Sequence, residues 1–412
     1  MTVVEAIERC RLCGSGAVSD LLDLGLHALS GLFPRVDAPD PVSVPLVLCR
    51  CSGCGLVQLR HSTDQNEMFT HEYGYRSDLN ASMKAHLKEL VDWTMHRARP
   101  QDGDAVLDIG CNDGTLLAAC AAPGLELFGI DPIVGKFIDE YPDDVIVHEG
   151  FFTSKAAGAF LNGRRMKVIT SVAMFYDLPE PDDFIAGIKS TLAEQGVWVF
   201  EQSYLVSMLK ACAFDSICHE HLEYWTLQQV EPLLGRHGLR LFDGEENDAN
   251  GGSFRLAACH ADASFSETAA LASMRQIEND MRLDTPAPFD AFKAKINKLA
   301  EQTHGLIERL NAEGKRVYAY GASTKGNTLL QYYGLDSRHI KAAVEVNPEK
   351  FGRHTPGTHV PIIPEAECMQ QGVDYFLVLP WHFREDILSR AQRYLDAGIK
   401  FIFPLPQLEI VE

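Results

Sequence analysis

Apolar, strand-like runs alternate with helical stretches in two separate parts of this 412-residue chain. In residues 105–258 the runs are AVLDIG, LFGID, VIVHEG, KVITSV, VWVFEQ and SFRLAAC. A second set follows RVYAYG near residue 316 and comprises IKAAVEVNP, PIIPEA, DYFLVLP and KFIFPLP. Strands separated by helices form mostly parallel sheets with helices on both faces. The sequence therefore predicts two α/β units.

Helical patterns and a cysteine-bearing segment surround these units. Apolar spacing of about 3.6 residues predicts an amphipathic helix over residues 79–99. Residues 264–313 predict a long helical stretch with a break near Thr285-Pro286-Ala287-Pro288. We expect a zinc-binding module over residues 1–72, a middle domain over residues 73–262, and a C-terminal domain with a helical connector over residues 263–412.

Charge and apolar content exclude several classes of protein. The formal net charge of −20 argues against bulk nucleic-acid binding, which needs a basic surface. It leaves room for one anionic ligand held by a few cations and helix N-termini. No run approaches about 18 apolar residues, and the start MTVVEAIERC lacks a signal-peptide pattern, so we expect a cytoplasmic protein without a membrane span.

Four of the 11 cysteines form two Cys-X-X-Cys pairs, Cys10 with Cys13 and Cys51 with Cys54. This spacing allows four thiolates to surround one tetrahedral Zn²⁺, and a closed shell of four sulfurs predicts a structural metal site. A loop or hairpin must fill the long gap between the pairs. The alternative is two reduced pairs without metal. A thioredoxin-like redox role is disfavoured because neither pair has a strand–CXXC–helix context.

A glycine-rich turn follows the first strand of the middle domain, in the run DIGCNDG. Gly110 allows close approach of a ligand, Gly114 allows the helix to pack on the strand, and Asp131 ends the next strand, where it suits ribose hydroxyls. Asp108 and a second acid in the turn repel phosphate and favour a cationic ligand. S-adenosylmethionine fits this polarity better than a dinucleotide; the alternative is an ordinary α/β turn with incidental acids.

Residues near the third and fourth strands complete the expected methyl-donor site. Glu149, Gly150 and Phe151 follow the third strand, where an acid and an aromatic ring suit adenine. We also assign Asn112 in the turn and Ser171 at the fourth strand to donor binding.

A His-Glu-His run, His219, Glu220 and His221, follows the fifth strand in CHEHLEYW. In an extended segment the two histidines point to one side and Glu220 to the other. A proton acceptor that titrates near neutrality suits removal of a hydrogen next to a ketone. The alternative is a cluster that is solvated or that only satisfies the core.

The second α/β unit carries a glycine turn with hydroxyls and a lysine, YGASTKGNT. Backbone N–H groups, a helix N-terminus and an ammonium suit a phosphate, so we predict a nucleotide-diphosphate site. The alternative is a purely structural repeat. The candidate substrate-binding residues in this unit are Lys325, Asn327, Glu345, Arg353 and His382.

Several motifs together resemble the sugar C-methyltransferases, including enzymes that act at C-3′ of dTDP-linked 4-keto-deoxysugars. They are CRLCG…CSGCGLVQL, YGYRS, DIGCNDG, CHEHLEYW, YGASTKGNTLLQYYG, EVNPEKFGRHTPGTHVPI and LPWHF. The resemblance implies an N-terminal structural zinc module, a middle class I S-adenosylmethionine-dependent methyltransferase domain with a Rossmann-like fold, and a C-terminal Rossmann-like domain. It also implies a dTDP- or GDP-linked sugar bound between the last two domains.

The resemblance further implies a mechanism, in which a base removes the proton next to the sugar ketone and the enolate takes the methyl group. It places His221 as the base, Glu220 as the residue that orients it, and His219 or a tyrosine such as Tyr224 near the ketone oxygen. The aromatic segment with Tyr73 and Tyr75 would reach the same cleft.

The chain departs from the family pattern at two positions near the expected sugar site. Characterised members have tyrosine where this chain has Cys218, and histidine where it has Asp177, which we still assign to substrate binding. Two other functions stay open: an O- or N-methyltransferase, and a zinc-bearing binding protein with an inactive transferase fold. For the oligomeric state we expect a monomer or a weak homo-oligomer.

Overall fold

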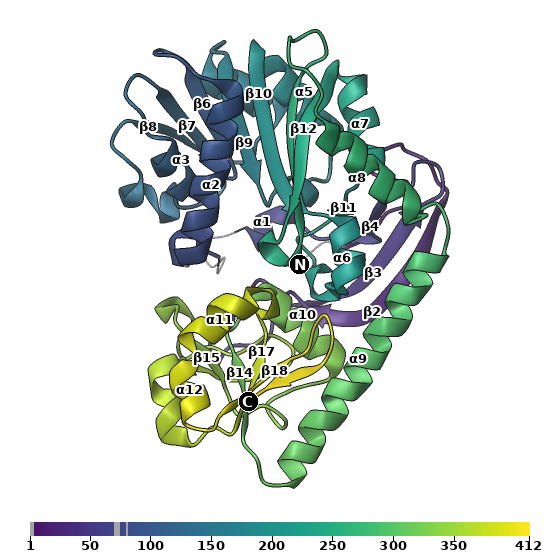
Figure 1. The fold of residues 1–412 in the computed structure, drawn as a ribbon, viewed down its shortest axis with the longest axis vertical. Helices are drawn as coiled ribbons and strands as arrows, with labels where there is room; N and C mark the ends of the chain where they lie inside the picture. The colour runs from purple at the N-terminus through teal and green to yellow at the C-terminus, as the bar shows by residue number, and fades with distance from the viewer. Residues whose placement is uncertain (1–3, 70–74, 80) are drawn as a thin grey trace.

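The middle of the chain forms a seven-stranded sheet in the computed structural model, which describes residues 4–69, 75–79 and 81–412 (Figure 1). The strand order is β12-β13-β10-β9-β6-β7-β8. The bounds are β6 Ala105–Ile109, β7 Glu126–Asp131, β8 Val145–Glu149, β9 Met166–Val172, β10 Leu192–Ser203, β12 Leu239–Asn247 and β13 Ser253–His260. Strand β13 runs antiparallel to β10 and β12, whereas β6 to β10 pair in parallel. This sheet confirms the predicted α/β fold, although the sequence did not single out β12.

Helices cover both faces of this sheet, and alternate residues of each strand face opposite sides. On β10, Val197 and Val199 pack in the same core as the apolar side chains of α2. Trp198 and Phe200 pack in the other core with side chains of α5. The helix bounds are α2 Ala81–Ala98, α3 Thr115–Cys120, α4 Ser154–Leu161, α5 Pro181–Thr191, α6 Leu205–Ala211 and α7 Leu227–Arg236.

The N-terminal module is built on a four-stranded sheet with the order β11-β4-β3-β2. Strands β2 (Val18–Ala28) and β3 (Ser43–Cys51) form the hairpin that fills the gap between the two cysteine pairs. Strand β4 (Val57–Leu59) pairs with β11 (Glu223–Tyr224), which directly follows the His-Glu-His run. The module also contains β1 (Glu5–Ala6), β5 (His61–Ser62) and α1 (Gln65–Met68). The module and the middle domain therefore share one sheet.

The C-terminal domain holds a six-stranded sheet with the order β16-β15-β14-β17-β18-β19, in which β19 runs antiparallel. Two helices, α8 (Ala269–Asp280) and α9 (Ala287–Ala312), precede it, with the break where the sequence predicts one. Helix α9 runs along one side of the molecule toward this domain (Figure 1). The remaining bounds are β14 Val317–Tyr320, α10 Thr324–Tyr333, β15 Ala343–Glu345, β16 Ile362–Pro364, β17 Tyr375–Val378, α11 Arg384–Arg390, α12 Gln392–Asp396, β18 Lys400–Phe403 and β19 Glu409–Val411.

The N-terminal module contacts both larger domains. The Gln331 side chain on α10 accepts a hydrogen bond from the Ala28 N–H (2.7 Å) and donates one to the Ala28 carbonyl (3.2 Å). On the other side, Arg236 of α7 donates to the Leu12 carbonyl (3.1 Å). The module thus links the middle and C-terminal domains. Within the described part of the chain, no helix combines the length and apolarity that crossing a membrane requires.

Candidate active site

The four predicted zinc ligands come together in the N-terminal module. The Sγ atoms of Cys10, Cys13, Cys51 and Cys54 all lie within 4.8 Å of one another. Gln58 donates to the Cys10 Sγ (3.2 Å), which is the type of outer contact that orients a metal ligand. Four sulfur donors around one point suit tetrahedral Zn²⁺ and leave no position for a reacting water, so the site is structural.

A first cavity, here called the donor cavity, opens at the C-terminal ends of β6, β7 and β9. Gly110 follows β6 with φ +76°, and a Cβ added there would lie 3.1 Å from the Met174 side chain. This close approach explains why the turn needs glycine. The predicted donor-binding residues that line this cavity are Asp108, Gly110, Asn112, Asp131, Gly150 and Phe151.

Two buried carboxylates give the donor cavity its polarity. Asp131 accepts hydrogen bonds from the backbone N–H groups of Asn112 (3.0 Å) and Ile133 (2.8 Å). Asp108 accepts one from the Thr170 hydroxyl (2.7 Å), and burial raises the pKa of Asp108 to about 7. A positively charged ligand in this cavity would favour the ionised form of both groups. This chemistry fits the ammonium and sulfonium of S-adenosylmethionine and disfavours a pyrophosphate.

Three predicted donor-binding residues have other contacts. Gly114 has φ +77°, and an added Cβ would lie 2.8 Å from the Tyr141 ring, so its role is packing. The Ser171 hydroxyl accepts a hydrogen bond from the Trp198 indole (3.0 Å) in the sheet core. Glu149 is solvent-exposed at the end of β8. None of these three residues lines the donor cavity.

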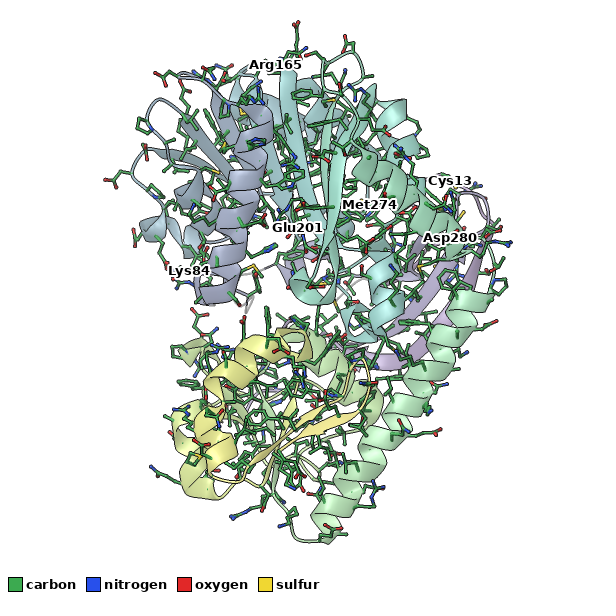
Figure 2. All side chains as sticks on the ribbon, in the orientation of Figure 1. Cys13, Lys84, Arg165, Glu201, Met274 and Asp280 are labelled. Atoms are coloured by element: carbon green, nitrogen blue, oxygen red, sulfur yellow. The ribbon has the colours of Figure 1, made fainter. Side chains whose placement is uncertain are left out.

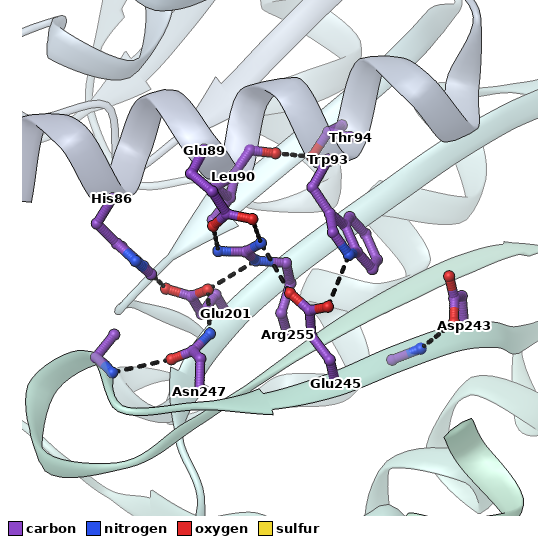
Figure 3. A network of polar contacts seen from close by, with 12 residues as sticks. His86, Glu89, Leu90, Trp93, Thr94, Glu201, Asp243, Glu245, Asn247 and Arg255 are labelled. Atoms are coloured by element: carbon purple, nitrogen blue, oxygen red, sulfur yellow. Dashed lines mark hydrogen bonds and ion pairs between the residues drawn. The ribbon is translucent and has the colours of Figure 1, made fainter.

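An ionic network centred on a buried arginine, which the sequence did not predict, lies beside the donor cavity (Figure 3 shows its contacts). Arg255 on β13 is fully buried, and its Nε lies 2.8 Å from Glu201 on β10. Glu201, together with His86 of α2, also lines the cavity, and these two side chains contact each other. Glu89 and Glu245 complete the contacts of the guanidinium. Figure 2 shows Glu201 at the end of the sheet nearest the C-terminal domain. The sequence feature that could have predicted this network is the acidic residue Glu201 near the end of an otherwise apolar strand.

A second cavity, here called the acceptor cavity, adjoins the donor cavity between the middle and C-terminal domains. The two share the lining residues Tyr75, Met83, Ala173, Asp177 and Asn250. The acceptor cavity is lined by the two residues that differ from the family pattern, Asp177 and Cys218. It is also lined by Glu220 and His221 of the His-Glu-His run. From the C-terminal domain it receives Lys325 and His382.

His221 has a defined tautomer in this cavity. Its Nδ1 lies 2.8 Å from the Ser216 carbonyl, which can only accept, so Nδ1 carries the proton and Nε2 holds the lone pair. The Tyr176 ring, which was not among the predicted site residues, packs against the imidazole with ring centroids 4.1 Å apart. Burial, followed by the charge of Lys325, lowers the pKa of His221 to about 3. The imidazole is therefore neutral at pH 7 with a free lone pair at Nε2, but its pKa does not lie near neutrality as the sequence predicted, so without a bound ligand it is a weak base.

Two carboxyl groups in the acceptor cavity favour their protonated forms. Burial raises the pKa of Glu220. Burial also raises the pKa of Asp177 well above its usual range, and the charges of Glu220 and Glu223 add to this shift. Both side chains are thus available as hydrogen-bond donors to a substrate oxygen.

The His-Glu-His run turns instead of extending, because the His221 N–H donates to the Cys218 carbonyl (3.1 Å). The predicted strand-like alternation is therefore wrong here: Glu220 and His221 line one cavity. His219 instead contacts the Val44 carbonyl of β3 through Nε2 (3.3 Å). The Tyr224 hydroxyl donates to the Ser216 carbonyl (3.4 Å) in the core. Tyr73 lies outside the described residues.

A third cavity, here called the C-terminal crevice, adjoins the acceptor cavity at the glycine turn of the C-terminal domain. The two share Tyr75, Arg76, Ser323, Pro380 and Phe383. Glu345 lines the crevice and accepts hydrogen bonds from the N–H groups of Ala322 and Asn347, both at 3.0 Å. The cations that line it are Arg76, Lys350 and Arg390.

Two residues predicted to bind substrate instead dock the N-terminal module. The Asn327 side chain donates to the Ser30 carbonyl (2.7 Å), and Arg353 donates to the Phe33 carbonyl (2.8 Å). The acceptors are about 300 positions away in the chain, so local sequence carries no sign of these contacts.

Comparison with known families assigns a different model to each part of the chain. Residues 10–69 match a family described as "Putative zinc binding domain". Residues 75–243 match one described as "Methyltransferase domain". Residues 248–406 match one described as "C-methyltransferase C-terminal domain".

A full-length relative and several solved structures are also similar. The C-methyltransferase NovU of Streptomyces niveus is 29% identical over 414 residues, which cover 99% of this chain and 98% of the relative. Magnesium protoporphyrin IX methyltransferase (ChlM) from Synechocystis PCC 6803, solved with bound SAH, is 15% identical, with a TM-score of 0.35, over 46% of this chain and 90% of its own. The CcbJ methyltransferase from Streptomyces caelestis is 14% identical, with a TM-score of 0.34, over 43% and 90%.

Proposed function

Because the chain is similar to a C-methyltransferase along nearly its whole length and matches a zinc-binding, a methyltransferase and a C-methyltransferase C-terminal family in turn, we propose that it is a sugar C-methyltransferase, which methylates the carbon next to the ketone of a nucleotide-linked 4-keto-deoxysugar. S-adenosylmethionine is the methyl donor and zinc is structural. The observation that carries the proposal is the row of three adjoining cavities. The donor cavity is lined by acids, the acceptor cavity contains a neutral histidine, and the crevice contains three cations. Each cavity shares lining residues with the next.

The proposed roles follow from the contacts of each residue. Asp108 and Asp131 bind the donor, whose sulfonium supplies an electrophilic methyl group. His221 accepts the substrate proton at Nε2, since Nδ1 is committed to Ser216. Glu220, which the resemblance placed as the residue that orients His221, and Asp177 would donate hydrogen bonds to sugar oxygens in the protonated forms that burial favours, whereas the Ser216 carbonyl orients His221. Arg76, Lys350 and Arg390 hold the diphosphate.

Mass spectrometry of the purified protein with a panel of dTDP- and GDP-linked 4-keto sugars tests the proposal. We expect one substrate to gain a methyl group on carbon. In D₂O without methyl donor, the same substrate should exchange the hydrogen next to its ketone, because deprotonation precedes transfer. A methylated product without such exchange would assign an O- or N-methyltransferase. Failure to bind S-adenosylmethionine in calorimetry would indicate a binding protein and overturn the proposal.

A further inference from the structure

We infer that Lys325 is a catalytic residue of the proposed reaction, whose ammonium holds the ketone oxygen and stabilises the enolate that forms there. The sequence pattern instead assigned Lys325 to the diphosphate. The inference rests on the proposed function and concerns the cavity in which the lysine lies.

Lys325 projects from the first turn of α10 into the acceptor cavity. Its Nζ donates to the carbonyl of Asn250, a residue of the middle domain that lines both the donor and acceptor cavities. The contact therefore fixes the ammonium at the junction of the two domains. It also places the ammonium where the methyl-donor and acceptor cavities meet.

The groups around the ammonium belong to the reacting centre. His221 and His382 both line the acceptor cavity. After burial, the positive charge of Lys325 is the next cause that lowers the pKa of each imidazole. Asp215 is fully buried and accepts a hydrogen bond from the Trp381 indole (2.8 Å); burial raises its pKa, and the charge of Lys325 opposes this rise. Burial lowers the pKa of Lys325, and the nearby Asp215 opposes this shift.

The phosphate site has cations of its own. Among the described residues, Arg76, Lys350 and Arg390 are the cations that line the C-terminal crevice, and Lys325 is not one of its lining residues. Lys350 lies directly at the glycine turn, where its Nζ donates to the Ala322 carbonyl (2.7 Å). The crevice also holds Glu345, which lies 3.9 Å from the Lys350 Nζ, and Glu365, so its three cations exceed its carboxylates by one and can bind a diphosphate without Lys325.

The chemistry favours a cation at this position. When His221 Nε2 takes the proton, the C–H bond breaks, its electron pair forms the C=C bond, and the carbonyl π pair moves onto oxygen. A fixed ammonium in a site shielded from water stabilises that oxyanion strongly. The same charge disfavours protonation of His221 in the empty cavity. An enolate between the two groups offsets this effect, so the histidine becomes a stronger base as the reaction proceeds.

Lys325→Met, Lys325→Gln and Lys350→Met separate the two roles. We expect Lys325→Met to slow both hydrogen exchange in D₂O and methyl transfer by about 10²–10³-fold, the cost of removing one oxyanion donor. Affinity for dTDP and GDP, measured by calorimetry, should stay within threefold. Lys325→Gln keeps a donor for the Asn250 carbonyl but loses the charge, and should be similarly slow. Lys350→Met should show the reverse pattern, with weaker nucleoside-diphosphate binding and nearly normal exchange at saturation.

The opposite result would overturn the inference. If Lys325→Met binds dTDP and GDP at least tenfold more weakly but exchanges hydrogen normally at saturating substrate, Lys325 is a phosphate ligand. S-adenosylmethionine affinity within twofold of the wild-type value verifies that each variant is folded. If the wild-type protein itself exchanges no hydrogen with any 4-keto nucleotide sugar, the proposed function fails, whatever the variants do.

Discussion

Two histidines that stand two positions apart in the chain have different surroundings. His221 lines the acceptor cavity, whereas His219 is buried against the Val44 carbonyl of β3. We predict that His221→Ala lowers kcat by about 10²–10⁴-fold, because a positioned general base contributes that much. S-adenosylmethionine affinity should not change. His219→Gln is the matched control and should lower the thermal stability while keeping kcat within a few-fold. Similar kcat losses in both variants would mean that His221 acts through the fold.

Asp108 predicts a pH dependence of donor binding. Its pKa of about 7 in the folded protein lies above the usual value of about 3.9, so between these pH values the folded state keeps a proton that the unfolded state has released. Its contribution to stability therefore falls as pH rises through that window. A bound cation favours the ionised form, so S-adenosylmethionine binding should release a proton and strengthen several-fold from pH 6 to pH 8.

Calorimetry across this pH range in the wild-type protein and two variants checks the prediction. Asp108→Asn should bind the donor with a clearly weaker pH dependence, because one of the two carboxyl groups whose pKa burial raises is gone and only Asp131 remains. Asp102→Asn, at an exposed position in the loop before β6, should keep the wild-type profile. A wild-type affinity that does not vary with pH would show that Asp108 does not titrate on donor binding.

At the scale of elements, the pairing of β4 with β11 connects the zinc module to the acceptor cavity. Glu223 and Tyr224 of β11 pair with Gln58 and Val57, and Gln58 also donates to the Cys10 sulfur. We predict that removing zinc with a chelator weakens this pairing. Amide exchange over residues 216–226 should rise and methyl transfer should fall at least tenfold, while S-adenosylmethionine binding in the middle domain persists.

Two cysteine variants give this prediction a matched comparison. Cys13→Ser removes a zinc ligand and should reproduce the effect of the chelator, with less zinc by elemental analysis. Cys49→Ser changes a buried thiol of the same module that donates to the Gln58 carbonyl (3.2 Å), and should keep full zinc content. Equal methyl-transfer activity with and without zinc would show that the zinc module does not support the acceptor cavity.

The sequence predicted which segments form helices and strands better than it predicted which strands pair with each other. Both α/β units and the zinc module follow from periodicity and cysteine spacing, because these signals are local. Strand β12 was missed because its second half, DGEEN, is polar. Strand β11 has two residues and exists through pairing with a strand more than 160 positions earlier. No local pattern encodes such a contact.

The same limit applies to the candidate site. The glycine turn and its acids could be predicted to line a donor cavity because strand ends in parallel sheets converge. The residues after β10 could not be placed, because a single turn at Cys218–His221 reverses the strand-like alternation. Asn327 and Arg353 carry side chains that suit a phosphate, yet they hold backbone carbonyls of a distant module.

At the scale of the whole molecule, the row of cavities depends on how the C-terminal domain is held against the middle domain. The hairpin β2–β3 fixes α10 through two hydrogen bonds between the Gln331 side chain and the Ala28 backbone. Lys325, at the start of the same helix, reaches the acceptor cavity. A contact about 300 residues apart in sequence thus positions a residue in the cavity between the domains.

Gln331→Leu tests this coupling. Loss of the side-chain amide leaves the Ala28 N–H and carbonyl without partners in a buried interface, at a cost of about 1–3 kcal/mol per group. We predict that KM for the nucleotide sugar rises at least fivefold and that amide exchange in α10 increases. S-adenosylmethionine affinity should stay within twofold, because the donor cavity lies on the middle domain. Gln392→Leu, an exposed change on α12 of the same domain, should leave both constants unaltered. If Gln331→Leu weakens donor and acceptor binding equally, the module supports global stability and does not set the position of the C-terminal domain.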